Sequence, residues 1–405
     1  MPVTFREAKL DNGLQFIAEV DPDAHTAAAG FWVATGARDE VPQHMGVSHF
    51  LEHMLFKGTE TRSAEDINRA FDDLGAVSNA FTSSEMTAYW LHLLPENLSK
   101  GVLVLSDMLR PALRAADFDS EKEVILEEIA MYNDQPFWVV YEKAMAHLYP
   151  EHPLGHRVLG TKETVGQLER EVMLAYFDKR YASDNITFAA AGAVDFDRLL
   201  DQLNDCCGSW SPSSATRDLA RPKSQSERED LAINELAQTY LLMLGPAPDA
   251  KSDQRHAASL LSHVFGGSDS SRLYWELVET GIAEEAQSSF DPRQNAGEFA
   301  TWAVVQPDRA EEVEQIIRSE ITRLPNTIEQ SELDRARARI ATAAVLASER
   351  PLGRVNRLAS NWLTRAAYIP IEADMQAIDA ITVADLCECA SSWPLEPTVT
   401  MVAHG

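Results

Sequence analysis

A polar stretch near the middle of the chain separates two halves that repeat a similar order of elements. Residues 209–230, SWSPSSATRDLARPKSQSERED, are rich in serine, proline and charged residues and have no periodic apolar pattern, which is typical of a linker. The 405 residues also exceed what one hydrophobic core usually supports. We therefore expect one domain over residues 1–210, a linker over 211–230 and a second domain over 231–405.

Strand-like and helix-like segments are mixed in both halves. FREAKLDNGLQFIAEV (5–20) predicts two strands around an Asp11–Gly13 turn, and AAAGFWVATGA (27–37) predicts a buried strand. LAQTYLLMLG (236–245), EFATWAVVQP (298–307) and TVTMVAHG (398–405) predict strands in the second half, with amphipathic helices between them. Because the order has no strict strand–helix–strand rhythm, we expect an α+β fold. Each of two homologous domains would pack helices on a mostly antiparallel sheet.

Helix boundaries are marked by local signals. Ser63 predicts the N-cap of a helix that stops at Gly75. Ser120 followed by Glu123 fits a capping box, so we expect another helix to begin near residue 119 or 120. Pro136 should interrupt that helix.

The charge balance excludes some partners. There are 35 Lys and Arg against 63 Asp and Glu, a formal net charge of −28, which should repel nucleic acids and anionic membranes. The acidic surplus could attract basic peptides, or could simply be a well-solvated surface. The N-terminal residues lack the apolar core of a signal peptide, and no apolar run approaches the roughly 20 residues of a spanning helix. We expect a cytoplasmic protein whose four cysteines, Cys206, Cys207, Cys387 and Cys389, stay reduced.

The stretch HFLEH at residues 49–53 is the strongest chemical signal. On a helix, His49 and His53 lie four apart on one face and can point two imidazoles at one metal ion. Glu52 lies at the edge of that face, where a carboxylate can reach a water on the metal. The competing interpretation is a solvated helix that carries two incidental histidines.

A further ligand would have to come from another element. EKEVILEEI (121–129) offers Glu121 and Glu128, which are two helical turns apart and share a face. Val124, Ile125 and Ile129 would seat that helix on the core. Taken alone, these glutamates could be ordinary solvated residues. They are candidates for a metal site only because the two histidines could share it.

Four stretches together resemble one family. They are GVSHFLEHMLFKGT (46–59), SNAFTSSEMTAYW (78–90), EKEVILEEIAMYNDQP (121–136) and HPLG (152–155). The chain resembles the inverzincin peptidases of the pitrilysin family, whose inverted zinc motif has the order His-x-x-Glu-His. It is most similar to the short branch that includes mitochondrial processing peptidase subunits and their bacterial relatives. The resemblance is specific over residues 10–195 and looser beyond them.

The resemblance implies a zinc-dependent endopeptidase that acts on peptides or unfolded segments. One zinc ion per chain would be held by His49, His53 and Glu128, with Glu52 as general base and Glu121 in a supporting role. Asn79, Ala80 and Phe81 match the strand to which family members add an extended substrate through main-chain hydrogen bonds.

The family also implies an assembly of four homologous domains, so a chain with two should form a homodimer or a heterodimer with a homologous subunit. One departure stands out. Active members often carry an arginine and a tyrosine in the C-terminal half, but here Val278 and Glu284 stand near those positions. Either another donor replaces the pair, or a partner subunit supplies it, or turnover is slow. The alternative function is a non-catalytic or partner-dependent subunit of a heterodimeric, processing-peptidase-like complex.

Overall fold

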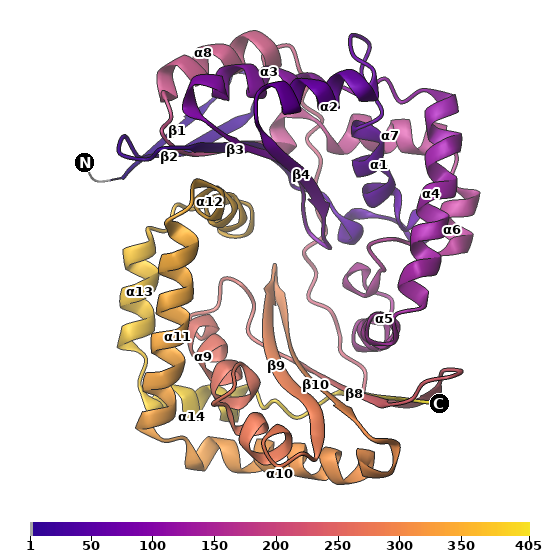
Figure 1. The fold of residues 1–405 in the computed structure, drawn as a ribbon, viewed down its shortest axis with the longest axis vertical. Helices are drawn as coiled ribbons and strands as arrows, with labels where there is room; N and C mark the ends of the chain where they lie inside the picture. Colours follow the sequence, from indigo (N-terminus) through magenta and orange to yellow (C-terminus); the bar gives the residue numbers. More distant parts are fainter. Residues whose placement is uncertain (1–2) are drawn as a thin grey trace. The chain divides into compact units, whose positions relative to one another are not determined.

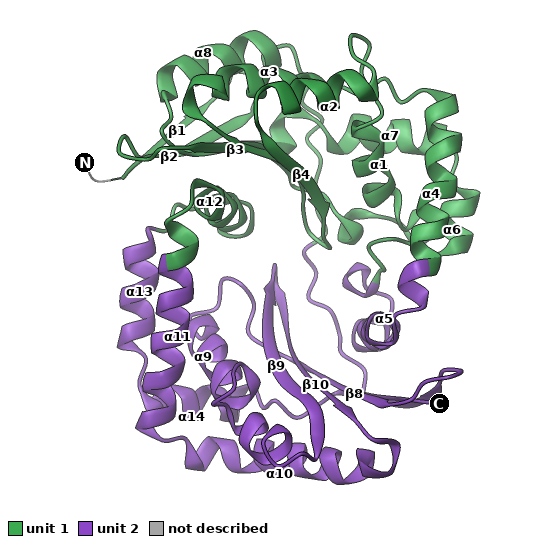
Figure 2. Ribbon diagram, viewed as in Figure 1, with its two compact units in different colours: residues 1–130, 156–218, 346–369 green, residues 131–155, 219–345, 370–405 purple. Residues whose placement is uncertain are grey.

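A computed structural model describes residues 3–405, which form two compact units (Figure 2). Unit 1 comprises residues 1–130, 156–218 and 346–369, and unit 2 comprises residues 131–155, 219–345 and 370–405. The units are thus discontinuous in sequence, whereas the sequence predicts continuous domains over 1–210 and 231–405. Those boundaries stay a prediction.

Unit 1 contains a six-stranded, mostly antiparallel sheet in the order β1-β2-β6-β3-β5-β4 (Figure 1). Only the β2–β6 pair is parallel among the pairs of this sheet in residues 3–405. The strands are β1 Thr4–Lys9, β2 Gln15–Val20, β3 Ala27–Val33, β4 Val77–Thr82, β5 Thr87–Leu93 and β6 Ile186–Gly192. The helices are α1 Val47–Leu55, α2 Ala64–Asp73, α3 Leu98–Met108, α4 Ala115–Asn133, α6 Lys162–Gln167, α7 Arg170–Arg180, α8 Phe196–Cys207 and α12 Pro351–Arg365.

Strand β3 is apolar throughout because helices cover both faces of its sheet. Alternate side chains point to opposite faces of a strand. Phe31 belongs to the large core beneath α1, α2, α3 and α8, while Trp32 belongs to a smaller core closed by Val355 and Leu358 of α12. Helix α12 comes from the second half of the sequence, so this sheet depends on a distant segment for its second face.

Unit 2 repeats the sheet without the counterpart of β1. Its order is β7-β11-β8-β10-β9, with one parallel pair, β7–β11, in the position of β2–β6. The strands are β7 Glu227–Ala232, β8 Thr239–Pro246, β9 Ala283–Arg293, β10 Ala296–Val305 and β11 Val399–His404. The helices are α5 Pro136–Leu148, α9 Arg255–Gly266, α10 Ala310–Thr327, α11 Gln330–Ser348, α13 Ile371–Ala380 and α14 Val383–Ser392. The matching order of strands confirms the expected α+β fold of two homologous halves.

The second face of the unit 2 sheet is likewise covered by a helix from the other half of the sequence. Val140 and Leu148 of α5 pack with Leu242 and Leu244 of β8. Leu241 and Met243, which alternate with them, face the core formed with α9, α10 and α14. Each half therefore contributes one helix to the sheet of the other half.

Several local predictions hold. Strands β1 and β2 flank the Asp11–Gly13 turn, Ser63 caps α2 with a capping box to Asp66, and Pro136 separates α4 from α5.

Other local predictions are wrong. Helix α4 begins at Ala115, so Ser120 lies inside it and is not its cap. The capping-box pattern misled because the preceding turn is already helical. Residues 227–230, expected in the linker, belong to β7. Tyr274–Val278 form a π-helical turn. Among residues 3–405, no helix has the length and apolar character needed to cross a membrane.

Candidate metal centre

Helix α1 is fixed at its first turn by a buried carboxylate. Gly46, at φ +92°, precedes the helix, and a Cβ there would lie 2.6 Å from the carbonyl oxygen of Leu159. The backbone N–H groups of Gly46 and Ser48 donate to Glu40 at 2.8 and 2.7 Å. Burial raises the pKa of Glu40 to about 8, while these hydrogen bonds act in the opposite direction. The carboxylate takes up N–H groups that the first helical turn cannot satisfy itself.

The two histidines of α1 lie side by side at the edge of the core. Phe50, Leu51 and Met54 anchor the helix in the core of unit 1. His49 is buried and His53 is partly exposed, with their ring centroids 4.7 Å apart. The four-residue spacing thus places both imidazoles on one face, as the sequence predicts.

Helix α4 brings the two expected glutamates to the same place. Ile125 and Ile129 are buried, and Glu121 lies beside them on the buried face. Glu128 is partly exposed because it lies at the edge of that face. Val124, expected to help seat the helix, is instead 45% exposed. It lies one turn before Glu128, beyond the edge of the buried stripe.

Three side chains, His49, His53 and Glu128, form a group that could hold a metal ion. Their ligand atoms all lie within 4.8 Å of one another. Glu128 Oε2 is 3.5 Å from His53 Nε2 and 3.9 Å from His49 Nε2. Ligand atoms around a tetrahedral zinc ion are about 3.3–3.5 Å apart. The two separations from Glu128 are therefore close to those between the ligands of a zinc ion.

Glu121 orients His53 rather than joining the ligand group. His53 Nδ1 lies 2.9 Å from Glu121 Oε1, so this nitrogen donates its proton to the carboxylate. The other ring nitrogen, Nε2, is then an acceptor and faces Glu128. Lys57 forms an ion pair with the second oxygen of Glu121. The two contacts from Lys57 to Glu121 and from Glu121 to His53 thus hold His53 in the tautomer that can bind a metal ion through Nε2.

His49 is held in its neutral form. Burial, with a smaller contribution from His53, lowers the pKa of His49 to about 3. Its Nδ1 is buried and has no hydrogen-bond partner among residues 3–405. A neutral imidazole has the lone pair that a metal ion binds.

Glu52 points toward strand β4. The hydroxyl of Thr82 donates to Glu52 Oε2 at 2.9 Å. Burial raises the pKa of Glu52, the Thr82 hydrogen bond and His53 lower it, and Glu128 raises it. The carboxylate therefore lies between the metal-ligand group and the last residue of β4.

Strand β4 is an edge strand, and within residues 3–405 one row of its backbone groups bonds to no other strand. Ser83 N donates to Met86 O at 2.8 Å across the turn to β5. Hydrogen-bonded pairs alternate in antiparallel sheets, so Phe81 and Asn79 also bond to β5, while the backbone groups of Ala80 point away from the sheet. The Ala80 N–H is taken by the side chain of Asn79 at 2.8 Å.

Comparisons with known proteins show which family the chain resembles. Residues 15–162 match the family described as insulinase (peptidase family M16), and residues 167–340 match the peptidase M16 inactive domain. An uncharacterised zinc protease of Rickettsia felis is 30% identical over 394 residues, which cover 96% of this chain and 95% of that protein. One of Mycobacterium leprae is 33% identical over 92% of this chain and 86% of that protein.

The chain belongs to peptidase family M16.

The fold is shared with a solved structure. The crystal structure of a protease from Helicobacter pylori superimposes with a TM-score of 0.93 and covers the whole of both chains, at 21% identity. The M16 family includes the pitrilysin peptidases that the sequence resembles, so that prediction is confirmed. The roles of individual residues are a separate matter and stay predictions.

The two side chains that stand near the expected arginine and tyrosine positions, Val278 and Glu284, carry no hydrogen-bond donor. Val278 ends the π-helical turn and packs against the core of unit 2. Glu284, in β9, accepts a hydrogen bond from the amide of Gln238. An aliphatic side chain and a carboxylate cannot stabilise negative charge on a substrate oxygen.

Three residues that contact the site were not found from the sequence. Lys57 follows α1, but its partner Glu121 lies on α4, so only the fold brings the two together. Thr82 lies three residues after Asn79 in the same edge strand, and only the fold brings it to Glu52. Glu40 reaches α1 through an irregular segment, for which the sequence carries no signal.

Proposed function

We propose that this M16 protein is a zinc-dependent endopeptidase for peptides or unfolded segments. The observation that carries the proposal is the convergence of His49, His53 and Glu128 from two helices, with the Glu52 carboxylate beside them. Such a donor set of two imidazoles and one carboxylate, with a coordination position left for water, is the arrangement of catalytic zinc sites.

The residues present fit zinc. The separations between Glu128 and the two histidines come close to those of tetrahedral coordination. Glu121 and Lys57 hold His53 in the tautomer that leaves Nε2 free. When bound, zinc would supply the Lewis acidity that makes water a nucleophile near neutral pH.

Glu52 would handle the proton in the reaction. Its carboxylate accepts a proton from the attacking water and then returns it to the nitrogen of the leaving amine. The Thr82 hydroxyl holds Oε2 of this carboxylate, which leaves Oε1 for the water. The helix that carries Glu52 is fixed by Glu40, so the base keeps its place relative to His49 and His53.

Strand β4 would orient the substrate. An extended peptide could add to this edge and bond to the outward backbone groups of Ala80. The side chain of Asn79 would have to release the Ala80 N–H first. Recognition through backbone atoms reads little side-chain identity, which suits an enzyme that accepts many sequences. The exposed side chains of Asn79 and Phe81 would then contact neighbouring substrate side chains.

The test is cleavage of a quenched fluorescent peptide library by wild type and Glu52→Gln, each with its zinc content measured. We expect about one zinc ion per chain in both proteins and a loss of at least about 100-fold in turnover in the variant. Chelation should abolish wild-type cleavage, and zinc should restore it. Equal cleavage by the two proteins would contradict the role of Glu52.

A second candidate is a subunit that needs a homologous partner for turnover. It is favoured by Val278 and Glu284, which offer no donor where active members often have two. In the same experiment this candidate predicts zinc in wild type without cleavage. Cleavage that appears only when a homologous chain is added would then decide for it.

A further inference from the structure

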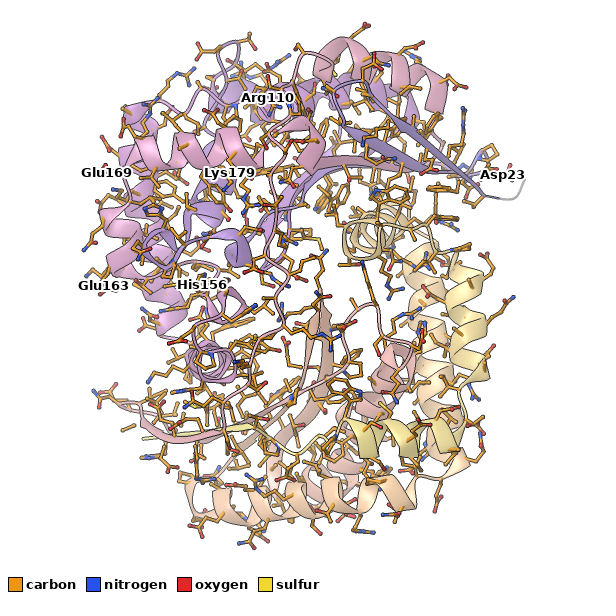
Figure 3. All side chains as sticks on the ribbon, turned by 180° about the vertical axis from the view of Figure 1, so that it is seen from behind. Asp23, Arg110, His156, Glu163, Glu169 and Lys179 are labelled. Carbon is orange, nitrogen blue, oxygen red and sulfur yellow. The ribbon has the colours of Figure 1, made fainter. Side chains whose placement is uncertain are left out.

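The polar segment that follows α8 is attached to unit 1 before it enters unit 2 at residue 219. The backbone N–H groups of Ser213 and Ser214 donate to the carboxylate of Asp184 at 3.0 and 2.8 Å. The Ser213 hydroxyl donates to the carbonyl of Lys179, which is labelled in Figure 3, at 2.6 Å. Arg180 donates to the carbonyl of Thr216 at 3.1 Å. This segment, expected to be a free linker, therefore has a defined path over residues 213–217.

This path delivers the guanidinium of Arg217 to two groups at once. Nε donates to Asp39 Oδ1 at 3.0 Å, and Nη2 donates to Asp39 Oδ2 at 2.5 Å. Nη2 also donates to the carbonyl of Glu85 at 2.5 Å. The side chain is 12% exposed and that of Asp39 is 1% exposed. A planar fork of donors can make this three-way contact, which a lysine ammonium on a flexible stem cannot reproduce.

Glu85 lies in the turn between β4 and β5, residues 83–86, and other contacts hold the same turn. Ala37 N donates to Ser83 O at 3.2 Å, and Arg38 N donates to Ser84 O at 2.8 Å. The Arg38 side chain donates to Glu85 Oε1 at 2.7 Å in a buried ion pair.

The segment that makes these contacts, residues 35–40, contains the 3-10 turn Ala37–Asp39 and is held by further hydrogen bonds. His156, labelled in Figure 3, donates from Nδ1 to the carbonyl of Ala37 at 3.2 Å. Asp39 also pairs with Arg180 and accepts from the N–H of Gly36. Asp39 therefore has several partners, and Arg217 joins it to the β4–β5 turn.

The β4–β5 turn affects the candidate site because it directly follows Thr82, which contacts Glu52. Thr82, the last residue of β4, donates its hydroxyl to Glu52, and only Ser83 and Ser84 separate it from Glu85. An edge strand is paired on one side only, so its position depends strongly on its partner strand and on its turn.

We infer that Arg217 is a positioning residue for the reaction. By bridging Asp39 and the carbonyl of Glu85, it holds the β4–β5 turn so that Thr82 stays on Glu52 and the edge of β4 stays in register for a peptide. The inference rests on the proposed function of β4 and Glu52. It assigns a role to a segment that would otherwise only connect the two units.

The test compares Arg217→Gln with Arg221→Gln, which removes an exposed arginine from the same segment. Arg221 pairs with Asp249 and its side chain is 75% exposed. The readouts are amide hydrogen exchange over residues 77–93, zinc affinity, and KM and kcat for an extended peptide. Asp39 keeps Arg180 in the variant, so we expect the fold to persist.

We expect Arg217→Gln to speed exchange over residues 77–86 about tenfold and to lower kcat/KM by a similar factor, the usual effect of losing one hydrogen bond to a charged group. Zinc affinity should stay unchanged, since no metal ligand is held through the turn. Arg217→Lys should fall between the variant and wild type, and Arg221→Gln should match wild type.

Two results would overturn the inference. One is unchanged exchange over residues 77–93 in Arg217→Gln. The other is a uniform rise in exchange across unit 1 together with weaker zinc binding, which would mean a general structural role. If Arg217→Gln does not fold, the same comparison is made with Arg217→Lys. The amide hydrogen-exchange measurement needs neither zinc nor turnover. A wild-type chain that cleaves no peptide would therefore contradict the proposed function, but hydrogen exchange would still test the role of Arg217.

Discussion

At the scale of single residues, the candidate centre depends on side chains that orient other side chains. His53 faces Glu128 through Nε2 because Glu121 holds its Nδ1, and Glu121 in turn is paired with Lys57. The pattern HFLEH gives His49, Glu52 and His53 from local spacing alone, because a helix places residues four apart on one face. Lys57 and Thr82 could not be assigned in that way, since their partners lie on other elements.

Removing the ammonium of Lys57 should weaken zinc binding without removing a ligand. In Lys57→Met, Glu121 loses its counter-charge and holds His53 less firmly, so we expect zinc affinity to fall about tenfold. Competition with a fluorescent chelator measures this change. Lys100→Met, at an exposed position of α3, is the matched control and should bind zinc like wild type. Equal affinities in the two variants would show that Lys57 does not support the site.

At the scale of elements, the sequence predicts features that depend on neighbouring residues, such as turns and helix caps. It does not predict features that depend on tertiary contacts, such as strand register. The Asp11–Gly13 turn, the Ser63 cap and the break at Pro136 depend on neighbouring residues, and each is where it was expected. The start of α4 was misplaced because Ser120 and Glu123 can also lie inside a helix. Asn79 to Phe81 could be placed on a strand, but only the register with β5 shows that Ala80 has the outward backbone groups.

The outward row of β4 predicts a two-residue rhythm in substrate recognition. A peptide that adds as a strand bonds to β4 through every second residue. Methylating single backbone nitrogens along a good substrate should therefore raise KM about tenfold at alternate positions and much less at the positions between them. Steady-state kinetics with the methylated series measures this pattern. A smooth dependence on position would contradict strand addition at this edge.

At the scale of the whole molecule, the two halves of the sequence exchange helices. Helix α12 closes the face of the unit 1 sheet that contains Ile17 and Trp32, and α5 closes the corresponding face of the unit 2 sheet. The order of strands repeats in the two units, as the sequence predicts, but the exchange carries no local signal. It arises because β3 and β8 are apolar on both faces and each needs a helix on each side.

The sharing of helices between the two halves predicts that residues 1–218 do not fold alone. Without α12 the side chains of Ile17 and Trp32 would face water, and each large apolar side chain exposed in this way costs about 1.5–3 kcal/mol. We expect this fragment to bind a hydrophobic dye and to melt without cooperativity. The matched control is residues 1–218 joined by a flexible linker to residues 346–369, which should melt cooperatively. A cooperative transition in the fragment alone would show that α12 is dispensable.

The most direct test of the account is the zinc content of two neighbouring glutamate variants, determined by elemental analysis after purification and dialysis. Glu128 belongs to the metal-ligand group, whereas Glu127 is exposed on the same helix and faces away from it. The account predicts about one zinc ion per chain in wild type and in Glu127→Gln, and a loss of most of the zinc in Glu128→Gln. Equal zinc content in the two variants, or no zinc in wild type, would contradict the claim that α1 and α4 together form a zinc centre.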